Sequence, residues 1–244
     1  MPHRPPHALL PVALVVLLAV PLAAQRVGAS LNLEGRAALL RATDYLLQRQ
    51  HANGSWQDVT ALTALVVHAL HAAAPALPTD LNADQAISQA RAWLQLTTKT
   101  TDLRRLLVPD ASATSPHDEL LRLDSLPQPA PPEMASWPPV PRLVAHLLTA
   151  SHPDDASLRL LYAAARHLDW NEATLTDSYW GARAFTACNR VGAIPYDHWQ
   201  ADILSALLDR QLGDGSWHAP EASPTDALHD TALTLLTLVL CLRE

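Results

Sequence analysis

Apolar and polar positions along this chain alternate between two kinds of helical segment. In the first kind, exemplified by residues 33–51, charges such as Glu34 and Arg41 recur along one face of the segment. In the second kind, exemplified by residues 57–74, nearly every residue is Ala, Leu, Val or Thr. A helix that is charged on one stripe lies at the surface, whereas a helix that is apolar on all sides is buried. The pattern therefore predicts outer and inner helices in alternation.

Four such pairs can be followed through the chain. Outer helices are predicted at residues 33–51, 82–98, 155–168 and 196–212, and inner helices at 57–74, 139–150, 176–191 and 226–242. Between the second outer and the second inner helix, residues 109–141 are rich in proline, which cannot continue a helix. We expect this stretch to be a surface insertion in an otherwise all-α domain of four helical hairpins.

Composition supports the helical prediction and limits the partners. Hydrophobic residues make up 49% of the 244 residues but aromatic residues only 5%, and there are only 7 glycines. Strands and tight turns need more β-branched, aromatic and glycine residues than this, which argues against a β-sandwich or β-barrel. The formal net charge of -7 provides no cationic field for phosphate backbones, so nucleic acid is not an expected partner.

Residues 1–24 are typical of a secretory signal peptide. Arg4 precedes an uninterrupted apolar run from Ala8 to Val20, and Ala24 supplies a small residue before the expected cleavage. Residues 8–24 fall at or below the roughly 17–25 residues of a spanning helix, and we expect no later segment to be long and apolar enough to span. The sequence therefore predicts a secreted or periplasmic domain of residues 25–244, with no stable membrane span after cleavage.

The two cysteines, Cys188 and Cys241, both lie in apolar helical contexts. Buried free thiols behave as small hydrophobic side chains, and this interpretation is favoured for both. A single disulfide between them is the alternative, because an exported protein meets an oxidising compartment.

One sequence element occurs twice. Residues 46–56 (LLQRQHANGSW) and 207–217 (LLDRQLGDGSW) share the pattern LLxRQxx[ND]GSW, and each is followed by Thr-Ala-Leu-Thr, at 60–63 and at 231–234. In each copy, the glycine accepts a positive φ and ends a helix, and the Trp then packs against the helix ends. The residues assigned to this structural repeat are Gln50, Gly54, Trp56, Gln211, Gly215 and Trp217.

The Gln…[Asn/Asp]-Gly-Ser-Trp signature followed by Thr-Ala-Leu resembles the QW-type repeat of the terpenoid cyclase and protein prenyltransferase superfamily. These repeats are also called prenyltransferase/squalene oxidase repeats. Residues 177–185, continued to 217, are also similar to secreted bacterial members of that superfamily. The resemblance implies an α/α toroid, which in that superfamily has about six hairpins. With four predicted hairpins, this chain is expected to form a reduced or open toroid.

The chemistry of the superfamily does not transfer. Cyclases of the squalene-hopene type use an acidic D-x-D-D run, and this sequence has none, since Asp154-Asp155 stands at the start of an outer helix where acids cap. Prenyltransferases bind zinc through Asp, Cys and His, and the nearest candidates here are Asp177, Cys188 and His229. Asp177 and Cys188 are eleven residues apart, which does not fit that set. We therefore expect no metal and no cofactor.

A candidate site follows from the arrangement that the resemblance implies. Parallel inner helices bring their N-termini, with partial positive charge, to one mouth of a toroid. Seven residues lie in or beside the first turns of these helices, and Arg183 lies one turn below Tyr179. The seven are Asp58, Thr60, Asp177, Tyr179, Trp180, His229 and Asp230. The hypothesis assigns catalysis to Asp177, Tyr179, His229 and Asp230, and ligand binding to Asp58, Trp180 and Arg183. In the alternative, the aspartates cap helices, the aromatic residues belong to the core and His229 faces solvent.

Two functions remain open at this point. The favoured one is a secreted, non-catalytic toroid domain that binds a small apolar ligand, a polysaccharide or a protein. It is favoured because the catalytic motifs of the superfamily are missing and the chain is short. The other is a toroid enzyme, terpenoid-cyclase-like or a polysaccharide lyase, with its site at the mouth of the inner helices.

Overall fold

The computed structural model describes residues 10–78, 81–97, 142, 144, 163, 165, 167–190 and 199–242, with side chains described from residue 28 onward and not for residues 187–190. Its helices are α1 (Leu10–Gln48), α2 (Thr60–Ala73), a 3-10 turn (Ala74–Ala76), α3 (Ala83–Thr97), α7 (Leu175–Arg190), α8 (Trp199–Asp209) and α9 (Pro224–Leu242). No strand occurs in these ranges, so the all-α prediction is confirmed for the part of the chain that is described.

Six of the eight predicted helices have a counterpart in these ranges. The first predicted outer helix is the C-terminal part of a longer helix, because α1 already begins at Leu10. The other two predicted helices, at 139–150 and 155–168, fall almost entirely outside the described residues, as does the proline-rich insertion at 109–141. The signal peptide of residues 1–24 stays a prediction.

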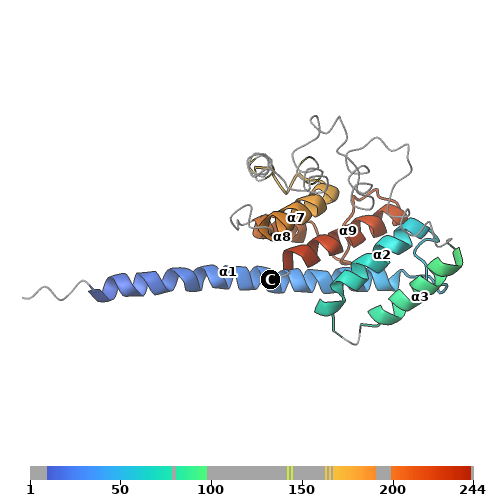
Figure 1. The fold of residues 1–244 in the computed structure, drawn as a ribbon, viewed down its shortest axis with the longest axis horizontal. Helices are drawn as coiled ribbons and strands as arrows, with labels where there is room; N and C mark the ends of the chain where they lie inside the picture. Colours follow the sequence, from blue (N-terminus) through green and yellow to red (C-terminus); the bar gives the residue numbers. More distant parts are fainter. Residues whose placement is uncertain are drawn as a thin grey trace, which may run out of the picture.

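Helix α9 is the centre of the described fold. It contacts α1, α2, α7 and α8 (Figure 1), and twelve of its residues are buried. Figure 1 shows α1 and α3 running from left to right, whereas α2 and α9 run in the opposite direction. Consecutive helices α1 and α2 therefore run in opposite directions.

Helix α9 also changes one expectation about membranes. Among the described helices it alone is long and apolar enough to cross a bilayer by length and composition, so the prediction that no later segment reaches this threshold was wrong. In the structure, 67% of that apolar stretch is buried against other parts of the chain. Core helices of soluble proteins pass the same test, so the length and composition of α9 are weak evidence of a membrane span.

The two copies of the repeat adopt the same local structure. The indole Nε1 of Trp56 donates to the carbonyl of Leu46 at 2.7 Å, and that of Trp217 donates to the carbonyl of Leu207, also at 2.7 Å. Both indoles are almost fully buried. Gly54 and Gly215, in the intervening turns, both have φ +92, a conformation that side chains with a Cβ rarely adopt. The Trp and Gly residues of the two copies therefore have the same local geometry.

The threonines that follow the repeat pair in a different register from the one predicted. The backbone N–H of Trp56 donates to Thr63 Oγ1 at 3.0 Å, and that of Trp217 donates to Thr231 Oγ1 at 3.2 Å. Thr63 is thus the counterpart of Thr231, and aligning Thr60 with Thr231 was wrong by three residues. The first copy contains Thr-Ala-Leu twice in succession, at 60–62 and 63–65, so the letters alone could not decide.

Gln50 joins the first repeat to the next outer helix. Its Nε2 donates to the carbonyl of Gly54 at 2.9 Å and to the carbonyl of Ala86, on α3, at 2.8 Å. A Cβ at Gly54 would stand 2.6 Å from the carbonyl oxygen of Gln89, so the turn lies directly on the backbone of α3. We call this contact of the first turn with α3 the first interface.

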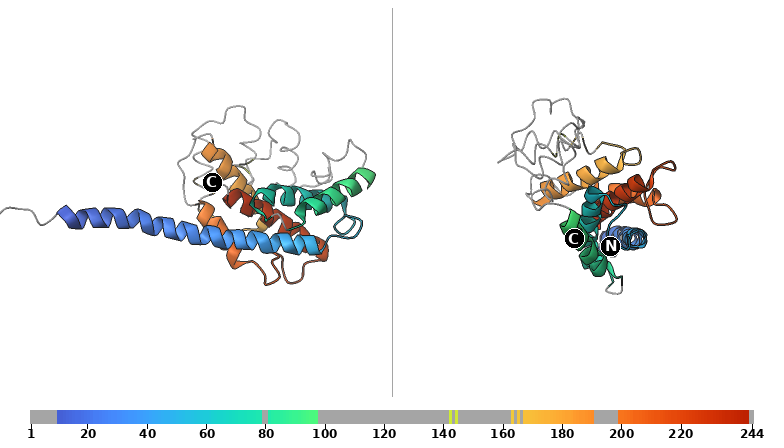
Figure 2. Two further views of the ribbon diagram at one scale, coloured as in Figure 1. Left: turned by 90° about the horizontal axis from the view of Figure 1, so that it is seen from below. Right: turned by 90° about the vertical axis from the view of Figure 1, so that its right-hand side faces the viewer.

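Gln211 makes the same connection from the end of the chain back to its beginning. Its Nε2 donates to the carbonyl of Gly215 at 3.0 Å and to that of Ala38, on α1, at 3.0 Å. A Cβ at Gly215 would stand 2.6 Å from the carbonyl oxygen of Arg41. We call this contact the closing interface, and Figure 2 shows α1 passing beside the C-terminal segments that form it. The last hairpin therefore docks on α1 as the first hairpin docks on α3.

Candidate functional site

Three of the predicted site residues lie together on α7. Arg183 Nη1 donates to the Tyr179 hydroxyl at 3.2 Å, and its guanidinium lies 5.5 Å from the centre of the Trp180 ring. The rings of Tyr179 and Trp180 meet edge to face at 5.0 Å, and both are buried. The cluster packs into the core, because neighbouring Gly181 leaves room for the ring of Trp170. Tyr179 and Trp180 thus serve packing, and Arg183 binds the phenol.

Asp177 caps α7. The hydroxyl of Thr174 donates to Asp177 Oδ2 at 2.7 Å, while the backbone N–H of Asp177 donates back to Thr174 Oγ1 at 3.0 Å. Ser223 and Asp226 repeat this reciprocal pair at the start of α9, at 2.6 and 3.2 Å. Such a box satisfies helix N–H groups that have no partner inside the helix. The geometry fits the capping alternative for Asp177.

His229 and Asp230 form a pair near the start of α9. His229 Nδ1 lies 3.3 Å from Asp230 Oδ1, and the two side chains are 51% and 33% exposed. An imidazole beside a carboxylate is an arrangement that orients a general base. Both groups face solvent, as the alternative hypothesis expected for His229.

Asp58 belongs to the turn of the first repeat. Its Oδ1 accepts hydrogen bonds from Asn53 Nδ2 and Ser55 Oγ, both at 2.7 Å, and its Oδ2 lies 3.6 Å from His51 Nδ1. The hydrogen bond from Asn53, followed by that from Ser55, lowers the pKa of Asp58. Asp58 and Gln57 both have positive φ, near 55°, an unusual pair for residues with side chains. The carboxylate thus fixes the turn, and Thr60 begins α2 just after it.

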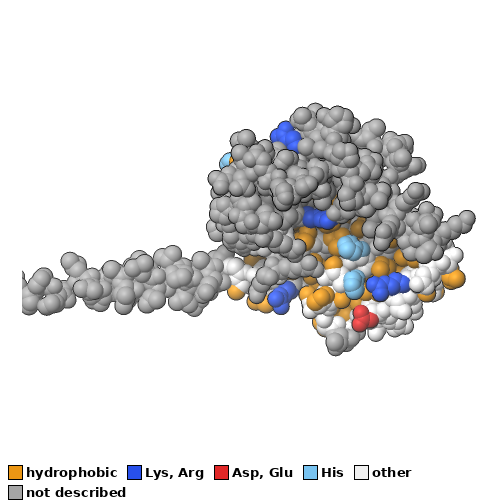
Figure 3. All heavy atoms as spheres, in the orientation of Figure 1, with side chains coloured by type: hydrophobic (Ala, Val, Ile, Leu, Met, Phe, Trp, Pro, Cys, Tyr) orange, Lys and Arg blue, Asp and Glu red, His pale blue; other side chains and the backbone are white. Residues whose placement is uncertain are grey.

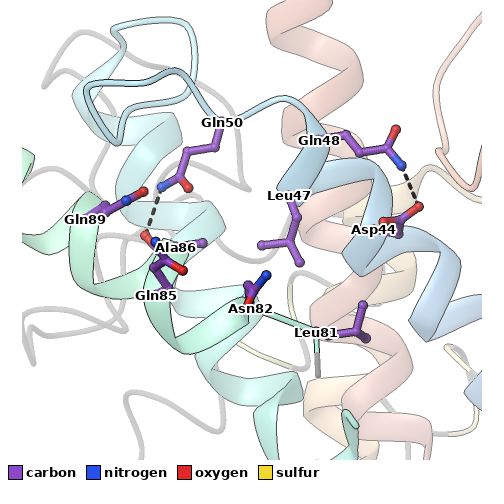
Figure 4. Close-up of a pocket in the computed structure, with 9 residues that line it drawn as sticks. All are labelled: Asp44, Leu47, Gln48, Gln50, Leu81, Asn82, Gln85, Ala86 and Gln89. Atoms are coloured by element: carbon purple, nitrogen blue, oxygen red, sulfur yellow. Dashed lines mark hydrogen bonds between the residues drawn. The ribbon is translucent and has the colours of Figure 1, made fainter. Parts of the chain in front are cut away.

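Two grooves flank α3, and neither is lined by the predicted mouth residues. The groove between α1 and α3 has a volume of about 330 Å³ (Figure 4), and the groove beside α2 has about 430 Å³. The first is lined by Asp44, Leu47, Gln48, Gln50, Leu81, Asn82, Gln85, Ala86 and Gln89. The second is lined by His71, Asp84, Ile87, Ser88, Arg91, Ala92 and Gln95. These volumes lie at the lower end of the roughly 300–1,000 Å³ of small-ligand sites.

The groove between α1 and α3 is rich in side-chain amides. Figure 4 shows Gln85 and Gln89 along α3 and Asn82 just before it, while the side chain of Gln48, on α1, points to Asp44. Gln48 donates to Asp44 Oδ2 at 2.6 Å. The amides on α3 make no side-chain hydrogen bond in the described structure, so they are available to a ligand. We call this site the amide groove.

The groove beside α2 carries charges of both signs. In Figure 3, imidazole, cationic and acidic side chains gather on the face formed by α2 and α3, and those lining the groove are His71, Arg91 and Asp84. Within the described ranges, no cluster of three or more His, Cys, Asp or Glu side chains has the arrangement of a metal site.

Sequence reasoning missed both grooves, although a signal was present. Asn82, Gln85 and Gln89 are spaced three and four residues apart, which places them on one face of a helix. What the sequence could not tell is that α1 lies opposite this face. No protein-family model, no curated protein and no solved structure matches this chain.

Proposed function

We propose that this chain is a secreted or periplasmic α/α-toroid domain, reduced to about four hairpins, that binds a partner and does not catalyse a reaction. The toroid is supported by the matching hydrogen bonds of the two repeat turns and by the way the last hairpin docks on α1. The proposal keeps the likeness to terpenoid cyclases and prenyltransferases at the level of the fold.

The observation that carries this proposal is that several residues of the predicted mouth form hydrogen bonds with nearby side chains and so have structural roles. A general acid or base must reach a substrate proton at about 2.6–3.2 Å, directly or through one water. Asp177 is engaged by Thr174, Asp58 by Asn53 and Ser55, and Tyr179 by Arg183. These contacts give a local structural role to three of the residues that the hypothesis of an enzyme site requires.

Of the three partner classes, the described surface favours a protein. Amides and charged groups line the two grooves on either side of α3, and no Phe, Tyr or Trp ring, which would stack on a sugar or pack on an isoprenoid, is among their described lining residues. A partner with hydrogen-bonding groups at regular spacing suits such a surface. The proposal includes no cofactor.

The second candidate is a toroid enzyme, terpenoid-cyclase-like or a polysaccharide lyase, and the His229–Asp230 pair favours it. A carboxylate 3.3 Å from His229 Nδ1 would orient the ring so that Nε2 could take a proton from a substrate. The proposal and this alternative differ in what His229 does, so His229 is the residue to substitute in a test.

Thermal-shift measurements on residues 25–244 test the two candidates. The wild type, His229→Ala and Asp177→Ala are compared with divalent metals, isoprenoids and acidic oligosaccharides, and product formation is followed for the last two. The quantity compared is the ligand-induced shift in Tm, because loss of the α7 cap by itself costs about 1 kcal/mol. The proposal expects no turnover and equal shifts in all three proteins. Turnover that disappears in His229→Ala would establish the enzyme instead.

A further inference from the structure

The first and closing interfaces differ at one corresponding position. Gly54 packs against the carbonyl of Gln89 as Gly215 packs against the carbonyl of Arg41, each at 2.6 Å from the added Cβ. Gln89 on α3 is therefore the counterpart of Arg41 on α1. The chain thus contains two versions of the same interface, one with an amide and one with a guanidinium at this place.

In the closing interface, the guanidinium fills a hydrogen-bonding position. Arg41 donates through Nε, at 3.0 Å, and through Nη2 to the Oε1 atom of Gln211. Gln211 meanwhile uses its Nε2 on the carbonyls of Gly215 and Ala38. Every polar atom of this glutamine side chain is engaged.

In the first interface, the same position is open. Gln50 uses its Nε2 on the carbonyls of Gly54 and Ala86, as Gln211 does on its own partners. Its Oε1 receives no hydrogen bond in the described structure, since Gln89 stands where the closing interface has Arg41. The Gln50 side chain lines the amide groove, and no guanidinium of the described residues occupies this acceptor.

The walls of the amide groove suit an extended chain that brings a cation. Asp44 on α1 supplies a carboxylate at the groove, and Leu47 and Leu81 supply apolar contacts between the helices (Figure 4). Gln85 and Gln89 are four residues apart, a rise of about 6 Å along a helix. Alternate residues of an extended peptide repeat about every 6.6 Å, so one peptide can meet both amides.

We propose that the amide groove binds an extended peptide segment bearing an arginine or lysine side chain. The cationic N–H groups donate to Gln50 Oε1, in the way that Arg41 donates to Gln211, and Asp44 balances the charge. The carboxamides of Gln85 and Gln89 pair with the peptide backbone, as donors to its carbonyls and acceptors from its N–H groups. The net charge of -7 favours the approach of such a segment. This inference rests on the proposed binding function and names the partner's chemistry.

Fluorescence anisotropy with residues 25–244 tests the proposal. The probes are fluorescein-labelled hexapeptides of alternating threonine and arginine, of alternating threonine and aspartate, and of threonine alone. We expect only the arginine peptide to bind, more weakly as salt is added. Asp44→Asn should weaken its binding several-fold.

The decisive variant is Gln89→Arg, which places at the first interface the guanidinium that Arg41 provides at the closing one. We expect it to fold with an unchanged or higher Tm and to lose arginine-peptide affinity by about tenfold or more. The matched control is Gln95→Arg, which adds the same charge to α3 but lines the groove beside α2. Its affinity for the peptide should stay near that of the wild type.

Three results would overturn the proposal. One is a folded Gln89→Arg protein that binds the arginine peptide as the wild type does. Another is equal weakening by Gln95→Arg, which would mean that only overall charge matters. The third is binding of a neutral glucan oligosaccharide that Gln89→Arg abolishes, which would make the groove a glycan site. Failure of the non-catalytic proposal is seen separately, as turnover that depends on His229 while peptide binding is intact.

Discussion

Arg49 of the first repeat lies 3.5 Å from Asp214 of the last, and so pairs the N-terminal helix with the C-terminal turn. The two side chains are 39% and 48% exposed, and such a surface ion pair contributes about 0–1 kcal/mol. The strength of the closing interface therefore comes from the contacts between the turn and the backbone of α1. Gln211 ties the turn to the backbone of α1, and Gly215 allows the close approach.

The two turn glycines should be equally intolerant of a side chain. In Gly54→Ala and Gly215→Ala, the new Cβ meets a backbone carbonyl oxygen at 2.6 Å, and the residue is held at φ +92. Because neither the neighbouring helix backbone nor the turn can yield cheaply, each substitution should cost about 2 kcal/mol or more. Urea unfolding of both variants measures this loss.

Gly213→Ala is the control for these glycines. It lies in the same turn as Gly215, but an added Cβ meets nothing within 4 Å. Its free energy of unfolding should stay within about 0.5 kcal/mol of the wild type. If Gly213→Ala is as damaging as Gly215→Ala, the close approach to α1 does not explain the glycine.

The threonine register can be tested with Thr63→Val and Thr231→Val. Each removes the acceptor for the buried backbone N–H of a repeat tryptophan, Trp56 or Trp217. An unpaired buried donor costs about 1–3 kcal/mol, and both variants should be destabilised to this extent. Thermal unfolding measures these losses. In the same experiment, Thr60→Val, at the first residue of α2, should have a stability close to that of the wild type. A loss at Thr60 equal to that at Thr63 would restore the register expected from the sequence.

The success and the failure of sequence reasoning here have the same physical origin. Helix positions were predictable, because a buried helix such as α9 must be apolar on every face and this leaves a local pattern. The repeat was predictable because Gly54 and Trp56 satisfy requirements within a few residues of the chain. The local sequence pattern therefore predicted the helices and turns, but not which of them contact one another.

The candidate site was harder to predict because its meaning depends on contacts. Thr174 and Asp177 are spaced as a capping box, so the structural role of Asp177 could be predicted from the sequence. The amide groove could not be predicted from the sequence, because it exists only where α1 lies against α3. It also depends on Gln89 standing at the first interface where Arg41 stands at the closing interface. Such a comparison between two interfaces exists only in three dimensions.

The Cys241 thiol should be unreactive in the folded protein. It is a free thiol buried in α9, and burial raises its pKa to about 12. The thiolate is the reactive form, so a thiol reagent at pH 8 should not label it until the protein unfolds. In a Cys188→Ser background, Cys241 is the only thiol that the reagent can label. Rapid stoichiometric labelling without denaturant would contradict the burial of this side chain.

Acid should selectively weaken the two repeat turns. The pKa of Asp58 is lowered by hydrogen bonds from Asn53 and then Ser55. At Asp214, burial raises the pKa, but hydrogen bonds from Ser216 and the charge of Arg49 outweigh it, so the pKa is lowered there too.

A carboxylate with a lowered folded-state pKa stabilises the fold above its unfolded-state pKa of about 3.9. This stabilisation is lost as pH falls through the folded-state value. The double variant Asp58→Asn/Asp214→Asn should therefore have a lower Tm than the wild type at pH 7, with the difference narrowing below about pH 4. Asp209→Asn, which removes an exposed carboxylate at the end of α8, controls for net charge. A Tm difference between the double variant and the wild type that stays constant from pH 7 to pH 3 would show that the turns do not depend on these ionised carboxylates.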